Sequence, residues 1–427
     1  MRLRRAAVAM LAAIALPAAA TQFPEGIGWH LEAEPWWSYQ SNPFRFSDAN
    51  DGERHSDMIT GALLRGGLKV PLLSERTRLE LSGTTGHARY AHYRQLDHNP
   101  AHFDGALRWH AGKLFSGNVR YRYGKSLYYN LNRTYPERDM VTTRRKQAEI
   151  NLHVSPRLIA PRVSVWRETT GYEYAEHHML FDRRSRHVEV SGTWLGTGRS
   201  SFTLGWQHAA GDYPNRTPEW VEQVGSRFKD DAYFADLHWD YSVKTQLAAR
   251  VGYQQRRYPG LAGRDASQWT TLLRAGWDYS PKTRFDLFGW HQAYPNDEDP
   301  EILYATVTGA RFSVRWRPTV KTMFSFAAAY ERQNDTPAVG NDARTSRLLR
   351  IGPRFEWRWH RRAMLFVDAW HDRNMGASAF SRYRNTVVRI GVVIQLDNRW
   401  EPPVDFFWRP ECQPPHYIEA MACQSFD

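Results

Sequence analysis

The sequence YFADLHWDYSVKTQLAARVGYQQRR, residues 233–257, lies in the stretch from Asp231 to Arg317 that decides the fold. In residues 233–241 the apolar or aromatic side chains fall on alternate positions, and mostly polar side chains fill the positions between them. The turn at residues 242–245 follows, and residues 246–256 alternate in the same way. A period of two places alternate side chains on opposite faces of a strand. The quoted sequence therefore predicts a hairpin of two-faced β-strands.

The hairpin pattern recurs along the stretch. Residues 269–279 lead to a second turn at 280–283, and residues 310–316 lead to a third at 317–322. Each time an aromatic residue comes just before the turn and a Lys-Thr pair opens the next strand. A period of about 40 residues indicates an array of like units. Two-faced strands with short turns at one end and longer loops at the other predict a transmembrane β-barrel.

The first twenty residues indicate export. Arg2, Arg4 and Arg5 precede an apolar run, and small residues at 18–20 form a cleavage site. These features are typical of a secretory signal peptide, which we assign to residues 1–20. No later stretch has the ~18 consecutive apolar residues of a membrane helix. Export also excludes nucleic acid as a partner, despite the net charge of +12.

Composition favours the barrel. The chain has 18 Trp, 21 Tyr and 20 Phe, and aromatic side chains gather at both edges of a membrane-spanning barrel. The pattern predicts an all-β, antiparallel up-and-down barrel of about 18 strands, in a range of roughly 16 to 18, over residues 21–398. Because an exported chain begins in the periplasm, the short turns should be periplasmic and the longer loops extracellular. A barrel of this size encloses an aqueous lumen.

Residues 399–427 form a tail rich in Pro and aromatic residues that contains Cys412 and Cys423. A disulfide between them suits an oxidising periplasm. We predict no metal site, because these thiols and His416 offer too few ligands. The loop at residues 41–55 is rich in Asp and Asn, but its spacing does not match a calcium loop, and we interpret it as a solvated loop. The tail is interpreted equally as a docking element, a partial plug or an ordered cap.

The inward face should carry the function. Alternation places twelve arginines there: Arg108, Arg120, Arg122, Arg250, Arg256, Arg274, Arg311, Arg315, Arg350, Arg354, Arg358 and Arg389. It places eight acidic residues there as well: Glu80, Glu149, Glu189, Asp236, Asp240, Asp278, Glu331 and Glu356. Guanidinium groups bind carboxylates and phosphates through paired hydrogen bonds, and charged side chains set pore selectivity. The arginines therefore either bind an anionic solute or polymer, or pair with acids across the wall.

Other residues are candidates for binding or catalysis. Trp166, Phe288 and Trp290 are candidate stacking platforms for sugar rings, although we favour girdle residues assigned to the wrong face. The sequence lacks the G-x-S-x-G, H-E-x-x-H and Gly-rich phosphate motifs. The pair His177 and His178 and the group of Asp368, His371 and Asp372 lie near predicted outer strand ends, where a barrel hydrolase could place its site. Two such clusters are expected by chance in a chain with 17 His. We therefore predict that the protein is not an enzyme and holds no cofactor.

Three sequence features carry a resemblance to a family. The Asn-Pro-Phe-Arg sequence at 42–45, the Gly-Asp-Tyr-Pro-Asn-Arg sequence at 211–216 and the repeated turns in the style of Ser-Pro-Lys-Thr-Arg at 280–284 resemble EpsL-type outer-membrane proteins of exopolysaccharide biosynthesis loci. That family is related to a broader group of β-barrel porins. The resemblance implies a role in exopolysaccharide assembly or export. It also implies a periplasmic export protein and an inner-membrane polymerisation system as partners.

These observations lead to three hypotheses for a barrel in the Gram-negative outer membrane, surrounded by lipid and lipopolysaccharide. The leading hypothesis is an export or assembly barrel for an exopolysaccharide, expected to be anionic because of the arginine-rich lumen. The alternative is a diffusion porin for small anionic sugars or nutrients. The third is a structural barrel that attaches polymer to the cell surface.

Overall fold

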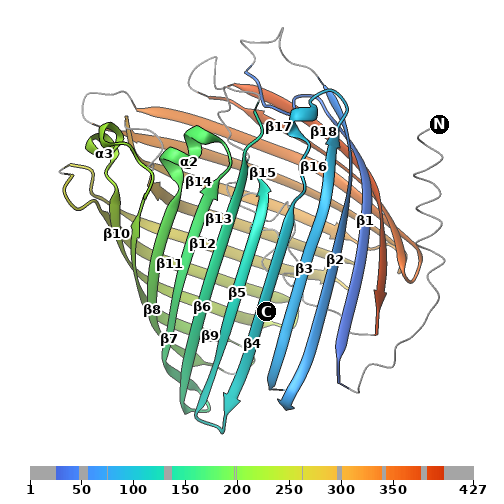
Figure 1. Ribbon diagram of the computed structural model, residues 1–427. Helices are drawn as coiled ribbons and strands as arrows, with labels where there is room; N and C mark the ends of the chain where they lie inside the picture. Colours follow the sequence, from blue (N-terminus) through green and yellow to red (C-terminus); the bar gives the residue numbers. More distant parts are fainter. Residues whose placement is uncertain are drawn as a thin grey trace.

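The computed structural model is a closed β-barrel (Figure 1). It describes residues 26–398 except for 48–55, 75, 129–136, 197, 199, 262, 296–300, 339–342 and 377–381. The predicted signal peptide, the tail with Cys412 and Cys423, and the acidic part of the first loop lie outside the described residues. Within the described residues, no helix is long and apolar enough to cross a membrane.

The strands and helices follow one another in chain order. Their bounds are β1 Gly28–Gln40, β2 Asp57–Ser74, β3 Thr77–Tyr90, η2 Arg94–Leu96, β4 Ala101–Ala111, β5 Phe115–Leu127, β6 Met140–Ser155, β7 Leu158–Tyr172, α2 Ala175–Phe181, β8 Arg183–Leu195, β9 Ser201–Asp212, α3 Pro218–Val224, β10 Arg227–Ser242, β11 Thr245–Arg257, β12 Ala266–Ser280, β13 Thr283–Pro295, β14 Ile302–Trp316, β15 Thr322–Pro337, β16 Arg344–His360, β17 Ala363–Asn374 and β18 Tyr383–Asp397.

The topology is up-and-down. Each strand pairs antiparallel with the next, and β1 pairs antiparallel with β18, so the 18-stranded sheet closes on itself. Closure leaves no free sheet edge. The connections alternate between short turns and longer loops, and α2 and α3 lie in the longer loops at one rim (Figure 1). The predicted fold class and strand number are confirmed.

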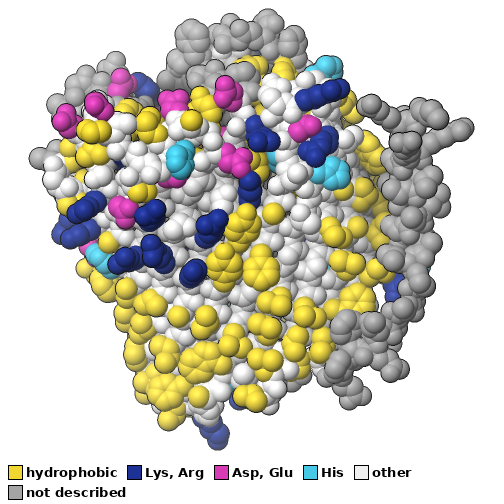
Figure 2. All heavy atoms as spheres, viewed as in Figure 1, with side chains coloured by type: hydrophobic (Ala, Val, Ile, Leu, Met, Phe, Trp, Pro, Cys, Tyr) yellow, Lys and Arg dark blue, Asp and Glu magenta, His cyan; other side chains and the backbone are white. Residues whose placement is uncertain are grey.

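The wall has an apolar outer face and a polar inner face. Tyr233 is 56% exposed, whereas the next residue, Phe234, is 9% exposed and lies inside the barrel. By the same alternation, Leu247 is partly exposed and Val251 more fully exposed on the outer face. Figure 2 shows the resulting belt of apolar side chains. Such a belt matches the hydrocarbon layer of a membrane. The alternation predicted for residues 233–257 is therefore confirmed.

Several predicted boundaries are wrong. Alternation in residues 102–127 predicts a tight turn around Phe115 and Ser116. The turn lies at residues 112–114 instead, where Gly112 adopts a φ of +62° that is costly for other residues. The sequence pattern also predicts that the longest internal loop runs from Ala210 to Lys229. The observed loop is shorter, because β9 continues to Asp212 and pairs there with Arg227. Helix α3 fills the middle of that loop, and the Thr217 side chain accepts a hydrogen bond from its first turn.

Candidate functional site

Arginine and acidic side chains form ion pairs between neighbouring strands on the inner wall. Arg350 faces Asp372 in register and binds its carboxylate with two nitrogen atoms. Asp368 accepts from Arg354 on one side at 3.0 Å and from Arg389 on the other at 2.9 Å. Charge-assisted pairs of this kind are stronger than neutral hydrogen bonds. The interpretation that arginines pair with acids across the wall thus holds for these three.

The same arrangement recurs around the barrel. Strand alternation places all twelve predicted arginines on the inner face. Their observed ion pairs include Arg108–Glu80, Arg120–Asp104, Arg122–Asp104, Arg250–Asp236, Arg256–Asp230 and Arg315–Asp286. Asp104, Asp230 and Asp286 are inward acids that the sequence analysis did not name. Pairing across the wall therefore lowers the net positive charge of the lumen below what the arginines alone suggest.

One cavity departs from this balance. It lies against the inner wall of β12–β18, has a volume of about 460 Å³, and is lined by seven arginines and only two aspartates, Asp286 and Asp368. The arginines are Arg45, Arg274, Arg311, Arg315, Arg350, Arg354 and Arg389. Six of them were among the twelve predicted, whereas Arg108, Arg120, Arg122, Arg250, Arg256 and Arg358 do not line this cavity. An excess of guanidinium groups at one place makes it the strongest candidate for an anion site.

Arg45, which strand alternation does not predict, comes from the first long loop. The buried side chain of Asn42 holds this loop by donating to the carbonyl of Phe46 at 2.9 Å and accepting from the Phe46 amide at 2.9 Å. Arg45 has a φ of +57°, an unusual value for a residue with a side chain. Its guanidinium lies 4.0 Å from Asp372 and 5.8 Å from the Tyr383 ring. The Asn-Pro-Phe-Arg motif at 42–45 was the available signal.

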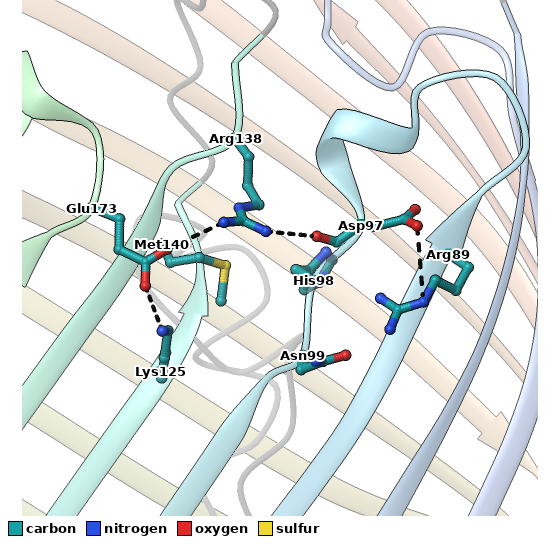
Figure 3. A pocket seen from close by; sticks show the side chains of 8 residues that line it. All are labelled: Arg89, Asp97, His98, Asn99, Lys125, Arg138, Met140 and Glu173. Atoms are coloured by element: carbon teal, nitrogen blue, oxygen red, sulfur yellow. Dashed lines mark hydrogen bonds and ion pairs between the residues drawn. The ribbon is translucent and has the colours of Figure 1, made fainter.

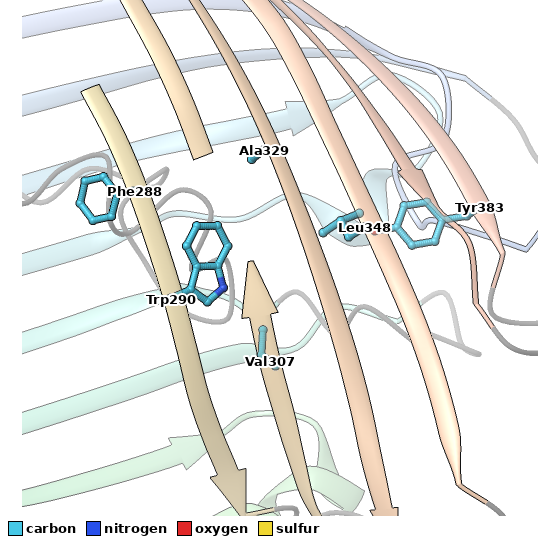
Figure 4. Packing of buried hydrophobic residues seen from close by; sticks show 6 residues of the cluster. All are labelled: Phe288, Trp290, Val307, Ala329, Leu348 and Tyr383. Carbon is cyan, nitrogen blue, oxygen red and sulfur yellow. The ribbon is translucent and has the colours of Figure 1, made fainter. Parts of the chain in front are cut away.

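An apolar cluster lies beside the arginines on the inner wall (Figure 4). Its members are Phe288, Trp290, Val307, Ala329, Leu348 and Tyr383. Phe288 also lines the cavity, and the Arg274 guanidinium lies 5.1 Å from its ring. The Trp290 indole donates to Glu331 at 3.1 Å. The cavity therefore joins a cationic wall to an aromatic one, an arrangement suited to an organic anion that carries a ring.

The interpretation of Trp166, Phe288 and Trp290 as girdle residues is wrong. Phe288 and Trp290 are 7% and 3% exposed on the inner face. Trp290 fits there because the neighbouring strand has Gly309 opposite it, where a Cβ atom would come within 2.3 Å of the indole. Trp166 stacks on His187 at 4.7 Å, and the Arg145 guanidinium lies 4.4 Å from its ring. Inward aromatics thus pack against glycine, histidine and arginine rather than lipid.

A second pocket lies at the extracellular rim (Figure 3) and is lined by both signs of charge. Glu173 pairs with Lys125 and with Arg138, the latter at 3.7 Å, and Arg138 also donates to the backbone carbonyl of Asp97 at 3.2 Å. Burial lowers the pKa of His98, so its imidazole is neutral at physiological pH. These contacts connect three loops to one another, and the pocket is lined by three cations and two acids.

The two His and Asp groups weighed for catalysis have structural roles. Asp139 accepts from the Tyr174 amide at 2.9 Å and lies 2.7 Å from Nδ1 of buried His177, so it fixes the start of α2. His371 points outward and contacts Thr386 at 2.9 Å, while Asp368 and Asp372 are buried on the inner face. In the part of the chain that the structure describes, no three His, Cys, Asp or Glu side chains gather as a metal site.

Comparison with known proteins identifies the fold. No family model matches the sequence, and no curated protein matches it. Among solved structures, OccK2 (OpdF) of Pseudomonas aeruginosa matches with a TM-score of 0.51 and 10% identity, over 88% of this chain and 99% of that one. OccK2 in complex with glucuronate matches with a TM-score of 0.50 and 10% identity, over the same shares. OccAB3 of Acinetobacter baumannii matches with a TM-score of 0.51 and 9% identity, over 87% and 99%.

This chain is a Gram-negative outer-membrane β-barrel. The closed 18-stranded fold, the exposed apolar belt and the likeness to outer-membrane barrels agree on this point. Within that class the architecture is porin-like, with a lumen bounded by charged side chains. At about 10% identity the likeness shows the fold alone. Assignment to the EpsL-type family, the Cys412–Cys423 disulfide and the protein partners stay predictions.

Proposed function

We propose that the barrel is a passive outer-membrane channel for small organic anions. The observation that carries this proposal is the lumen cavity lined by seven arginines and two aspartates. Solutes that pass such a surface exchange water for guanidinium contacts, which suit carboxylates and phosphates. The side chains of Asp286 and Asp368 offset part of the charge, so the surface attracts anions without holding them irreversibly. Conduction needs binding of this intermediate strength.

The shape of the cavity points to anions with a ring. Phe288 and Trp370 line it together with the arginines, so an apolar or sugar face and a carboxylate find partners in one place. OccK2, a barrel of the same architecture, has been solved with glucuronate. Glucuronate combines a sugar ring with one carboxylate, and it is therefore the probe we would use first. Glucose serves as the neutral comparison of similar size.

The test is selectivity in planar bilayers. In a KCl gradient the reversal potential should show preference for chloride, and glucuronate should block the current more than glucose does. The double variant Arg311→Gln/Arg315→Gln should reduce both effects several-fold, because two of the cavity's seven cations are removed. The double variant Arg167→Gln/Arg186→Gln makes the same charge change on the outer wall. Equal selectivity in all three proteins would refute the proposal.

A second candidate function is export or assembly of an anionic exopolysaccharide. The resemblance of residues 42–45 and 211–216 to EpsL-type proteins favours it, and an arginine-lined lumen suits an anionic polymer as well as a small anion. Under this proposal the partners are a periplasmic export protein and an inner-membrane polymerisation system. A channel that is closed without its partner would then show little conductance in bilayers.

Deletion of the gene in its host separates the candidates. Polysaccharide is measured in the medium, on the cells and in the periplasm. Loss of external polymer supports export, and normal release with loss of polymer from the cell surface supports the third hypothesis, a surface-attachment barrel. Unchanged polymer in all three fractions favours the channel for small anions. Uptake of labelled glucuronate by the deletion strain should then fall relative to the parent strain.

A further inference from the structure

Exposed cations form a row on the outer wall of the barrel, on the face away from the lumen. The row crosses six neighbouring strands, β6 to β11, and we call it the outer basic band. Its members are Lys146, Arg167, Arg186, Lys229 and Arg257, and each is exposed. Alternation places them outside, because the next residues along β6 and β8, Gln147 and His187, are more buried and hydrogen-bonded or stacked inside.

The band brings like charges together. Lys146 lies directly opposite Arg167, and Arg167 lies directly opposite Arg186. Ala210 separates Arg186 from Lys229, which is opposite Arg257. Like charges at directly opposed positions destabilise a sheet. An anion would relieve this repulsion, and it must come from outside the chain unless the chain has acidic side chains beside these cations.

The chain does not supply one within the described residues. Lys146, Arg167, Arg186 and Lys229 form no ion pair there, and Arg257 contacts only the amide oxygen of Gln255, at 3.4 Å. The outward carboxylate of Asp231 lies 2.9 Å from Nδ1 of His208 instead. Inside the lumen, by contrast, arginines on the same and neighbouring strands have acidic partners, such as Arg162 with Glu149.

The band lies at one edge of the apolar belt. Two residues further toward the periplasm on β6, β7 and β8, the outward positions hold Ala148, Val165 and Val188. Figure 2 shows Lys and Arg side chains gathered directly above the apolar belt, over the strands drawn in teal and green in Figure 1. The band is on the side of the long loops and is therefore extracellular. This is the depth at which the headgroups of the outer leaflet lie.

We propose that the outer basic band binds the phosphate groups of lipopolysaccharide, with a lipid A headgroup as its partner. The outer leaflet of this membrane consists of phosphorylated glycolipid, so phosphates meet the wall at the edge of the apolar belt. Guanidinium groups bind phosphate through two parallel hydrogen bonds, and the opposed cations then share an anion instead of repelling one another. The acyl chains lie along the valine and alanine side chains below.

A second row strengthens the assignment. Arg144, Arg184 and Arg227 are also exposed on the outer wall, two positions further toward the extracellular rim on β6, β8 and β10. Across the strands, Thr169 lies between Arg144 and Arg184, and Asp212 lies between Arg184 and Arg227. Two rows of cations, one above the other, suit a headgroup that carries more than one phosphate.

The test measures binding of purified lipid A to the full-length protein folded in detergent. The probes are diphosphorylated lipid A, the same lipid without phosphates, and inorganic phosphate. The variant is Lys146→Gln/Arg167→Gln/Arg186→Gln. The control is Lys113→Gln/Lys244→Gln/Lys321→Gln, which removes the same charge from exposed turns at the periplasmic end. We expect the band variant to bind lipid A on the order of 100-fold more weakly than the wild type, and the control to bind normally.

Thermal unfolding gives a second readout, because the difference in melting temperature between the wild type and the band variant should change sign when lipid A is added. Without lipid A the band variant should melt at or above the temperature of the wild type, because repulsion is removed; with lipid A the wild type should melt higher. Wild-type affinity in the band variant would overturn the proposal. So would equal protection by lipid A without phosphates or by inorganic phosphate alone. If the triple variant does not fold, Arg167→Gln and Arg167→Lys provide the same comparison with one side chain.

Discussion

Arginines on the two faces of one wall have opposite surroundings. On the inner face, Arg350 forms an ion pair with Asp372, and Arg256 forms one with Asp230. In both pairs the two residues are directly opposite each other on neighbouring strands. On the outer face, Arg167 is opposite Lys146 and Arg186. The inner arginines are parts of the wall that also present charge to the lumen. These three outer cations contribute no ion pair to the described structure, so their role concerns what surrounds the barrel.

The largest expected difference is in stability. Arg65 is 1% exposed on the inner face and binds both Glu32 and Glu34, which are also buried. Arg65→Gln removes the cation that contacts both buried carboxylates, and we expect a loss of about 3–5 kcal/mol. Arg186→Gln on the outer face should change the free energy of unfolding by less than about 0.5 kcal/mol. Urea titration of both variants in lipid vesicles measures this, and similar midpoints would show that the two faces do not differ in stability.

Ion selectivity should separate the faces next. Arg315 lines the cavity; its side chain is 45% exposed, and its guanidinium lies 3.6 Å from Asp286. Arg315→Glu places two carboxylates beside each other in the lumen, so the chloride-to-potassium permeability ratio should fall several-fold. Arg186→Glu makes the same reversal outside and should leave the ratio unchanged. A shift of equal size in both variants would mean that selectivity comes from the overall charge rather than from the cavity.

The period of two explains how much of this was predictable. It assigned the faces of residues 233–257, the strand number and the inward position of all twelve arginines, because these depend on alternation alone. Boundaries failed where ladder pairing extends into polar sequence, as in β9 up to Asp212. The acids at 104, 230 and 286 lie on the same strands and faces as Arg108, Asp236 and Phe288, so alternation alone places them inward. Which arginine each acid pairs with was not predictable, because cross-strand register depends on turn geometry that the sequence does not state.

The cavity itself could not be predicted from the sequence, for two reasons. Arg45 reaches the lumen from a loop whose path depends on the Asn42 hydrogen bonds, and no periodicity describes a loop. Trp290 was assigned to the girdle because tryptophan is frequent there. Its inward position depends on Gly309, which lies on the next strand and leaves space for the indole.

Arg45 offers a sharper test of the inner face, because its backbone and its charge can be changed separately. Arg45→Gly removes the cost of a φ of +57° and should stabilise the loop by about 1 kcal/mol, whereas Arg45→Gln keeps that cost. Both variants lose the charge and should reduce glucuronate block to a similar extent. Thermal unfolding and block in bilayers measure the two effects. Normal block in both variants would remove Arg45 from the anion site.

The smallest expected effect is the salt dependence of the outer face. In detergent without lipopolysaccharide, the opposed cations Lys146, Arg167 and Arg186 repel one another at low salt. Raising the ionic strength from about 0.01 to about 0.15 M shortens the screening length from about 30 to about 8 Å, which should relieve a few tenths of a kcal/mol. Salt weakens the ion pairs of the lumen in the wild type and in the Lys146→Gln/Arg167→Gln/Arg186→Gln variant alike. The difference in melting temperature between the two proteins therefore isolates the outer face. It should shrink as salt rises, and a difference that stays constant would show that these cations do not repel one another.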